Sequence, residues 1–449
     1  MSAEVFTSVQ SMIKRLKTSH FVRNVAMVGG GIAAAQAIAL IFMPLLTRQY
    51  GPEAFGVAAA FAAIVNIITP LATMGYANAI VMPDSDDDAA AVARLSILCG
   101  LIMVPTSLVT VYLGKPWLAV WTGMEQASYM LYLIPLSLLI TAFLSVANQS
   151  AIRAHLFKAK ARAYVESTLV TNISKLVGGI LAPSGLLLII LTLAGQVTNF
   201  VMQMLRVPRK GVLKPTNWFG FNGVRTAAIS QRDFALYRMP QSVINAAAVG
   251  LPVILLSTFS SAAAGQYSVT VLVLGAPVML LGQAIGEVFY PKITAAIRQR
   301  SSEALRLMIK ATLILSGLAV IPFGIVVVFG PELFALVLGD EWRVAGEYSQ
   351  WVALWLACVL ATRAVLAAFP ALSLQSYMLI QEMLSVTLRS AALIVGLKYW
   401  SSDLVAVALF SLVGVVLMCT LAAVGFWKLR KESRVWRKFA KAQPTQSGF

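Results

Sequence analysis

Long apolar segments alternate with short polar gaps along the whole chain. Twelve of these segments are each close to the ~20 residues that a helix needs to cross ~30 Å of hydrocarbon. They cover residues 24–47, 56–81, 92–113, 128–151, 163–182, 185–205, 241–259, 267–289, 308–329, 348–369, 373–397 and 403–427. The pattern predicts an all-α integral membrane protein with about 12 transmembrane helices.

The positive charges between these segments are strongly one-sided. Starting from the N-terminus, alternate gaps, together with the first three residues of the spans that follow them, hold 28 of the 35 Lys and Arg residues. The intervening gaps hold only four, which are Arg48, Lys115, Arg343 and Lys398. Because cytoplasmic loops are enriched in Lys and Arg, we expect both termini to be cytoplasmic. The other three, Lys175, Arg363 and Arg389, lie within predicted spans.

Composition supports a membrane protein and argues against nucleic-acid binding. The chain is 59% hydrophobic and 12% charged, with a formal net charge of +17. A nucleic-acid-binding domain would gather its charge on one folded surface. Here the charge is spread over six short segments, where anionic lipid head groups are the natural partner. The chain carries no Walker motif, metal-ligand pattern or nucleophile–base pair, so we expect no cofactor, no metal and no enzymatic activity.

The longest polar stretch, residues 206–240, divides the spans into six and six. We therefore expect an N-terminal six-helix bundle over 1–205, a basic cytoplasmic linker over 206–240, a C-terminal six-helix bundle over 241–430 and a basic cytoplasmic tail over 431–449. An interfacial helix is expected near the N-terminus, within residues 1–20. Pro and Gly recur at similar intervals in both halves, at Pro44, Gly56, Pro70 and Pro83 and at Pro252, Gly265, Pro277 and Pro291. This repeat favours two bundles around a central cleft.

An acidic run precedes the third segment. Residues 83–88 read Pro-Asp-Ser-Asp-Asp-Asp, which alternates carboxylates as a calcium loop does. The Gly and the distal Glu of a calcium loop are missing. The run therefore predicts a helix N-cap at the start of the third span.

Four blocks of sequence resemble a known family. They are residues 44–56 (PLLTRQYGPEAFG), 233–240 (DFALYRMP), 286–291 (GEVFYP) and 330–346 (GPELFALVLGDEWRVAG). In this order, and at these span boundaries, they resemble the Wzx-type polysaccharide flippases of the MOP exporter superfamily. The likeness extends from about residue 20 to residue 430.

The resemblance implies a MATE-like fold and a lipid-linked cargo. The cargo would be a polyprenyl-diphosphate-linked oligosaccharide, moved from the cytoplasmic to the outer leaflet of the bacterial inner membrane for surface polysaccharide, O-antigen or exopolysaccharide synthesis. Membrane lipids, a polysaccharide polymerase and chain-length proteins are the other implied partners. Because an unpaired charge is very costly in hydrocarbon, such a protein needs a polar, cationic cleft that opens alternately to each side.

Charged and polar residues within the spans are the candidates for this cleft. We expect Lys175, Arg363, Arg389, Arg48 and Asn172 to contact the diphosphate or sugars, since Arg matches phosphate with two parallel hydrogen bonds. Alternatives remain for three of them. Lys175 can pack against one carboxylate, Arg363 can pair with Glu382, and Arg48 can extend to the interface.

Three acidic residues are candidates for ion coupling. Glu382 and Arg389 are seven residues apart on one helical face, which we expect to line the cleft. Glu287 and Glu166 lie near the inner ends of their spans, where local or interfacial roles compete with coupling.

Two other classes of protein fit part of the pattern. A multidrug or small-molecule antiporter shares the superfold, but its cleft should favour carboxylates. A membrane polysaccharide polymerase or ligase would need a large outer loop with catalytic Arg or His, and no outer gap exceeds about twenty residues.

Overall fold

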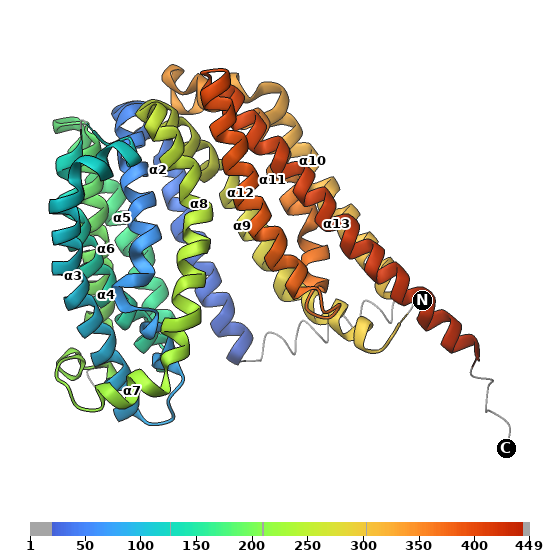
Figure 1. The fold of residues 1–449 in the computed structure, drawn as a ribbon, viewed down its shortest axis with the longest axis horizontal. Helices are drawn as coiled ribbons and strands as arrows, with labels where there is room; N and C mark the ends of the chain where they lie inside the picture. The colour runs from blue at the N-terminus through green and yellow to red at the C-terminus, as the bar shows by residue number, and fades with distance from the viewer. Residues whose placement is uncertain (1–19, 126, 209–210, 302, 443–449) are drawn as a thin grey trace. The chain divides into compact units, whose positions relative to one another are not determined.

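All twelve predicted spans are helical. The computed structural model describes residues 20–125, 127–208, 211–301 and 303–442. The long helices are α2 (His20–Ile68), α3 (Asp86–Thr122), α4 (Ile134–Arg153), α5 (Phe157–Leu181), α6 (Gly185–Arg206), α8 (Met239–Phe259), α9 (Ser261–Arg298), α10 (Glu303–Leu338), α11 (Arg343–Ala368), α12 (Gln375–Tyr399) and α13 (Asp403–Ala442) (Figure 1). The all-α prediction is confirmed. The interfacial helix expected within residues 1–20 lies outside the described residues, apart from His20.

Ten helices of the described residues are long and apolar enough to cross a membrane. The number is below twelve for two reasons. Predicted spans one and two form the single long helix α2, which bends at Gly51 with φ 68° and ψ 169°. Only glycine adopts this conformation without strain, and Pro52 then restarts the helix. The fifth predicted span, α5, is helical but too polar to be counted among the ten.

The helices form two compact units. Unit 1 runs to Ser261 and unit 2 starts at Ala262. Unit 1 therefore holds seven of the predicted spans and unit 2 holds five. Helix α8 belongs to unit 1 because it packs along α2, where Gly250 lets Ala63 and Ile67 approach its backbone closely. The hydroxyl of Ser257, near the end of α8, also donates a hydrogen bond to the Thr122 carbonyl oxygen at 2.5 Å.

Small residues bring the helices of unit 1 together. A Cβ atom on Gly31 of α2 would lie 2.6 Å from the Ala161 Cβ of α5, and one on Gly100 of α3 would lie 2.7 Å from the Ala142 Cβ of α4. In a bilayer the hydrophobic effect does not drive helices together, so helices associate through close backbone packing of this kind. Two short 3-10 helices, η1 (Thr69–Thr73) and η2 (Tyr76–Val81), complete the second span.

The described part of residues 206–240 forms short helices that pack within unit 1. They include the short helices η4 (Gly211–Leu213), η5 (Pro215–Trp218), α7 (Val224–Ser230) and the π-helix η6 (Phe234–Arg238). Trp218 is fully buried, and its indole N–H donates to the Val212 carbonyl oxygen at 2.6 Å. Arg94 of α3 holds the same segment by hydrogen bonds to the carbonyl oxygens of Asn217 and Asn222, at 3.0 and 2.8 Å.

Unit 2 is built from α9 to α13. Helices α10 and α11 meet at Gly330 and Gly346, whose backbones are too close to admit a Cβ on either residue. A core around Phe369 and Val365 joins α11 to α9, α10 and α13. Helix α13 continues without a break from the last predicted span into the basic tail, as far as Ala442.

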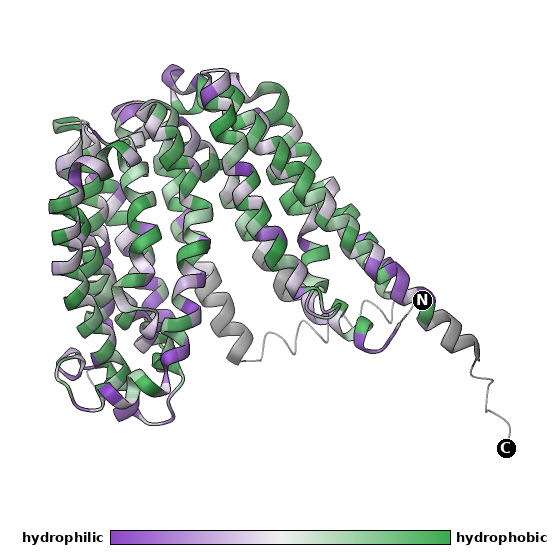
Figure 2. Cartoon of the chain, in the orientation of Figure 1, coloured by the Kyte–Doolittle hydropathy of each residue, from purple (hydrophilic) through white to green (hydrophobic). Residues whose placement is uncertain are grey.

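The proline–glycine repeat of the sequence is only partly matched by local structure. Pro44 and Pro252 both lie inside long helices. In contrast, Pro70 begins a 3-10 helix, whereas its counterpart Pro277 lies inside α9. In both units the outward surfaces of the long helices carry hydrophobic residues (Figure 2), including the exposed Leu113, Ile180 and Ile321. This is the surface expected of a protein solvated by lipid.

Candidate functional site

Lys175 lies in the middle of α5, which packs against α2 and α6. The Tyr50 hydroxyl donates a hydrogen bond of 2.6 Å to the Lys175 carbonyl oxygen, which fixes this turn of α5 beside the bend at Gly51. Lys175 is half-buried. Among the described residues, no carboxylate oxygen lies within 4.0 Å of its ammonium group. Among the residues that the structure describes, no carboxylate therefore pairs with Lys175, as the alternative of packing against one carboxylate required.

Polar side chains lie near Lys175 where α2, α5 and α6 pack together. We call Asn172, Gln49 and Gln196 the polar seam. Asn172, one turn away, is buried and donates to the Thr168 carbonyl oxygen at 2.8 Å. The side-chain oxygens of Gln49 and Gln196 are buried without a hydrogen-bond partner among the described residues. Unpaired amide oxygens are costly to bury, so the seam can accept hydroxyl or amine donors from a ligand.

Arg389 is enclosed within unit 2. Its guanidinium lies over the ring of Trp355 from α11 at 3.7 Å and over the ring of Phe410 from α13 at 3.8 Å. Its Nε donates to the Phe410 carbonyl oxygen at 3.3 Å. Its neighbour on the same face, Glu382, is exposed, so the two residues have different surroundings.

Arg363 packs against the backbone of α9. A Cβ atom on Gly282 would lie 3.1 Å from the Arg363 Nε and 3.4 Å from its Cζ, so the glycine makes room for the guanidinium. The Nε is buried and has no hydrogen-bond partner among the described residues. The alternative ion pair between Arg363 and Glu382 is not among those that the described residues form.

The other candidates are placed apart from these cations. Arg48 is exposed, three residues before the Gly51 bend. Glu166 forms an ion pair with Arg206, which joins the first half of α5 to the end of α6. Glu287 belongs to α9, but its side chain lies outside the described ones.

Sequence reasoning missed the residues that surround the arginines. Trp355, Phe410 and Gly282 come from three different helices, and no spacing along the chain connects them to Arg389 or Arg363. Among the described residues, no group of three His, Cys, Asp or Glu side chains is arranged to hold a metal ion.

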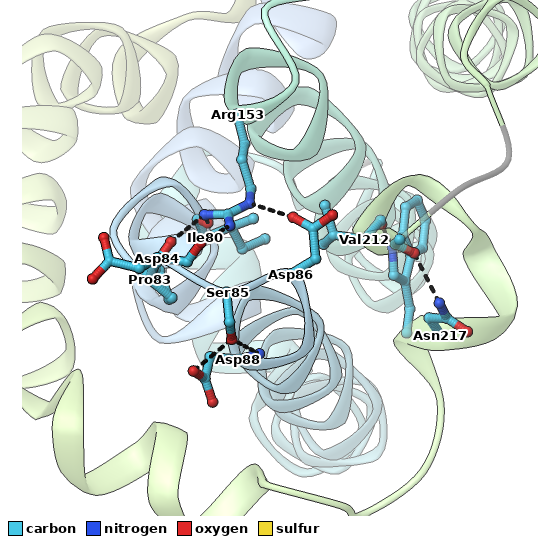
Figure 3. A network of polar contacts seen from close by, with 11 residues as sticks. Ile80, Pro83, Asp84, Ser85, Asp86, Asp88, Arg153, Val212 and Asn217 are labelled. Atoms are coloured by element: carbon cyan, nitrogen blue, oxygen red, sulfur yellow. Dashed lines mark hydrogen bonds and ion pairs between the residues drawn. The ribbon is translucent and has the colours of Figure 1, made fainter.

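One further polar site lies at the end of unit 1 that we predict to be cytoplasmic (Figure 3). Arg153 pairs with Asp86 at 3.2 Å and donates to the carbonyl oxygens of Ile80, Pro83 and Asp84. Ser85 caps α3, accepting a hydrogen bond of 3.1 Å from the Asp88 backbone N–H, which confirms the predicted N-cap.

A pocket of ≈ 530 Å³ lies beside this network, bordered by Met82, Asp84, Arg153 and His155 among others. The guanidinium of Arg153 is occupied by protein groups, so the network stabilises the turn between η2 and α3 and leaves no cation for a ligand.

The sequence of residues 45–347 matches a protein family described as "Polysaccharide biosynthesis protein". The match covers about two thirds of the chain and nearly all of the four sequence blocks. The chain belongs to this family. The resemblance to polysaccharide flippases inferred from those blocks is thereby confirmed. No curated protein sequence matches the chain.

Solved structures of the MOP superfamily share the fold of this family member. An inward-facing MATE multidrug resistance transporter is 15% identical with a TM-score of 0.65, over 90% of this chain and 96% of that one. The lipid II flippase MurJ in an inward closed conformation is 12% identical with a TM-score of 0.66, over 94% and 93%. A MOP superfamily transporter from Pyrococcus furiosus is 16% identical with a TM-score of 0.52, over 92% and 96%.

At these identities the likeness establishes the fold. The chain is therefore a multi-pass membrane protein with the fold seen in these MOP transporters.

Proposed function

We propose that this protein moves a polyprenyl-diphosphate-linked oligosaccharide from the cytoplasmic to the outer leaflet of the bacterial inner membrane. The polysaccharide biosynthesis family supplies the pathway, and the MOP fold supplies the transporter architecture. Lys175, Arg363 and Arg389 supply the chemistry. They are cations within predicted spans, and no ion pair to them is found among the described residues.

The observation that carries this proposal is that no carboxylate among the described residues pairs with these three cations. A buried charge without a counter-ion is costly, and an anionic ligand would remove that cost. A diphosphate is such a ligand, and its sugars would find hydrogen-bond partners in the seam that holds Asn172. A drug antiporter for cations would need the opposite charge at these positions.

The test is deletion of the gene followed by leaflet-resolved analysis of polyprenyl-linked sugars. We expect the deletion strain to lack surface polysaccharide and to accumulate the lipid-linked sugar on the cytoplasmic face. The wild-type gene should restore the surface polysaccharide. Arg363→Ala and Arg389→Ala should fail to restore surface polysaccharide although the protein reaches the membrane. Accumulation on the outer face would indicate a polymerase or ligase defect, and no accumulation would favour another cargo.

We propose that Glu382 couples transport to protons, since its carboxylate is exposed on α12 and forms none of the ion pairs found among the described residues. Glu382→Gln removes the titratable group and keeps the shape. We expect the variant to transport in proteoliposomes at a rate that no longer responds to an imposed pH gradient. A rate that follows the gradient as in the wild-type protein would exclude Glu382 from coupling.

We further propose that transport alternates by rocking of the two helical halves, with both termini in the cytoplasm. A polysaccharide polymerase and chain-length proteins would receive the product on the outer side.

A further inference from the structure

The exposed side of α10 changes character at one end. Ile314, Ile321 and Val328 are exposed and follow one another at intervals of seven residues, so they lie on one stripe of the helix. Lys310 and Arg306 continue this stripe towards the N-terminal end of α10, in steps of four residues, and both are exposed. The stripe is therefore apolar over the predicted span and basic at its predicted cytoplasmic end.

Helix α13 shows the same change. Val416 and Trp427 are both exposed and lie about three turns apart on one stripe. Lys431 and Arg434 continue this stripe beyond the predicted span and are exposed as well. The Lys431 ammonium lies 5.3 Å from the centre of the Trp427 ring. Because tryptophan is enriched at membrane interfaces, the change from hydrophobic to hydrophilic residues along α13 (Figure 2) falls where acyl chains give way to head groups.

The basic ends of both helices are folded parts of unit 2. Ala304 and Met308 of α10 and Leu429 of α13 are fully buried in one cluster, together with Ile293 of α9. Each of the first three lies two residues before a basic residue of a stripe, and two residues correspond to about 200° around a helix. Packing of the buried sides therefore holds the basic residues on the outside of the unit.

The cations on these stripes differ from the arginines of unit 1. We call them the stripe cations: Arg306, Lys310, Lys431 and Arg434. Among the described residues, no hydrogen bond or ion pair is found for any of them. On α13, Glu432 is already paired with Lys428 at 3.4 Å. In unit 1, by contrast, Arg153 is bonded to a carboxylate and to three carbonyl oxygens. The N–H groups of the stripe cations are therefore available to an anion.

The order of apolar and basic residues along each stripe indicates which anion fits. A free phosphate or an acidic protein would contact the basic end alone and would gain nothing from the apolar residues that lead to it. An acidic phospholipid meets both, because its acyl chains lie along the apolar part while its phosphate lies at the depth of the cations. Side chains one turn apart have Cβ atoms about 5–6 Å apart, close enough to share one phosphate.

We propose that the stripe cations bind the head groups of acidic phospholipids in the cytoplasmic leaflet. Arg306 and Lys310 form one site, and Lys431 and Arg434 form the other. The inference goes beyond the proposed function and holds whatever cargo the protein moves. Each site recognises the charge and depth of a head group, so phosphatidylglycerol should bind and the electrically neutral phosphatidylcholine should not.

The test is native mass spectrometry of the purified full-length chain, titrated in a neutral detergent with phosphatidylglycerol. We expect two tight sites. The pair variants Arg306→Gln/Lys310→Gln and Lys431→Gln/Arg434→Gln should each weaken one of them about tenfold or more, since a Lys or Arg near acidic head groups is worth roughly fivefold in affinity. Arg306→Lys/Lys310→Arg keeps both charges and should bind as the wild-type protein does.

Lys214→Gln/Arg225→Gln is the matched control. It removes two exposed cations from the segment of short helices in unit 1 that contains no predicted span, so both tight sites should remain. Phosphatidylcholine and the soluble head group sn-glycerol 3-phosphate, each added at the same concentration, should fail to displace phosphatidylglycerol. Because all the substituted side chains are exposed, thermal unfolding without added lipid should be unchanged in every variant.

Three results would overturn the inference. The first is tight binding of phosphatidylglycerol at both sites in both pair variants. The second is an equal loss in Lys214→Gln/Arg225→Gln, which would mean that net charge alone attracts the lipid. The third is displacement by sn-glycerol 3-phosphate, which would assign the cations to a soluble anion. Pair variants that bind lipid normally but lose surface polysaccharide in cells would point instead to an acidic cytoplasmic protein.

Discussion

Arg363 is packed against the backbone of Gly282, and it takes part in none of the ion pairs found among the described residues. The guanidinium keeps its charge at any physiological pH, and its Nε is buried without a partner among the described residues. The absence of a side chain at Gly282 therefore leaves the space that the Arg363 guanidinium occupies.

Gly282→Ala tests the position of Arg363 without removing its charge. The added methyl group would lie 3.1 Å from the Arg363 Nε, so the guanidinium must move by a few tenths of an ångström. We expect normal protein levels in the membrane and a several-fold loss of surface polysaccharide. Gly275→Ala is the control on the same helix, since its Cβ meets no atom within 4 Å. Equal polysaccharide from both variants would show that the exact position of Arg363 is unimportant.

Lys175 and Arg153 should respond oppositely to removal of their charge. Lys175→Met removes a half-buried cation for which no ion pair is found among the described residues, so we expect unchanged or higher thermal stability and a loss of transport. Arg153→Ala removes contacts to Asp86 and three carbonyl oxygens, and should lower stability by about 1.5–3 kcal/mol. Thermal unfolding in detergent measures both. If Lys175→Met were as unstable as Arg153→Ala, Lys175 would have a structural role.

At the scale of elements, α2 shows how one residue divides a long helix. Gly51 adopts a φ of 68°, and the chain then resumes as a helix at Pro52. The bend separates two predicted spans, and it lies beside the turn of α5 that carries Lys175, because Tyr50 bonds to the Lys175 carbonyl oxygen.

Gly51→Ala should lower the stability of the protein by about 1 kcal/mol, because a side chain is strained at this φ. Gly30→Ala, in the same helix, is the control. Its Cβ would meet nothing within 4 Å, and alanine favours the helical state. We expect Gly30→Ala to be neutral or stabilising in thermal unfolding. A Gly51→Ala protein as stable as the wild type would mean that α2 can straighten.

The helices were predictable from sequence because lipid demands long apolar runs. The N-cap at Ser85 was predictable because its signal is local. The domain boundary was not, because the packing of α8 on α2 depends on Gly250 meeting residues almost two hundred positions away. The charges of Arg363 and Arg389 could be recognised as unusual from the sequence, because they lie within apolar spans. Their neighbours Gly282, Trp355 and Phe410 could not be predicted, because only the packing of separate helices brings them to the arginines.

At the scale of the whole molecule, the sidedness of the chain is the property most directly open to experiment. In a cysteine-free background, we expect Lys115→Cys to react with an impermeant maleimide added to intact spheroplasts. His155→Cys, on the opposite predicted side, should react only after the membrane is permeabilised. The reverse pattern would place both termini outside and would contradict the direction proposed for transport.

The arginines at the predicted cytoplasmic end of unit 1 have a further consequence for how the protein interacts with lipid head groups. Arg94 and Arg153 bind backbone carbonyl oxygens, and Arg206 pairs with Glu166. These three arginines contribute to the count that orients the chain, yet their hydrogen-bonding capacity is largely spent within the protein. Their charge still adds to the net charge of +17 and so to the general attraction towards acidic phospholipids. Few of their N–H groups remain to bind a head-group phosphate directly, so specific lipid binding at this end should depend on other Lys and Arg residues.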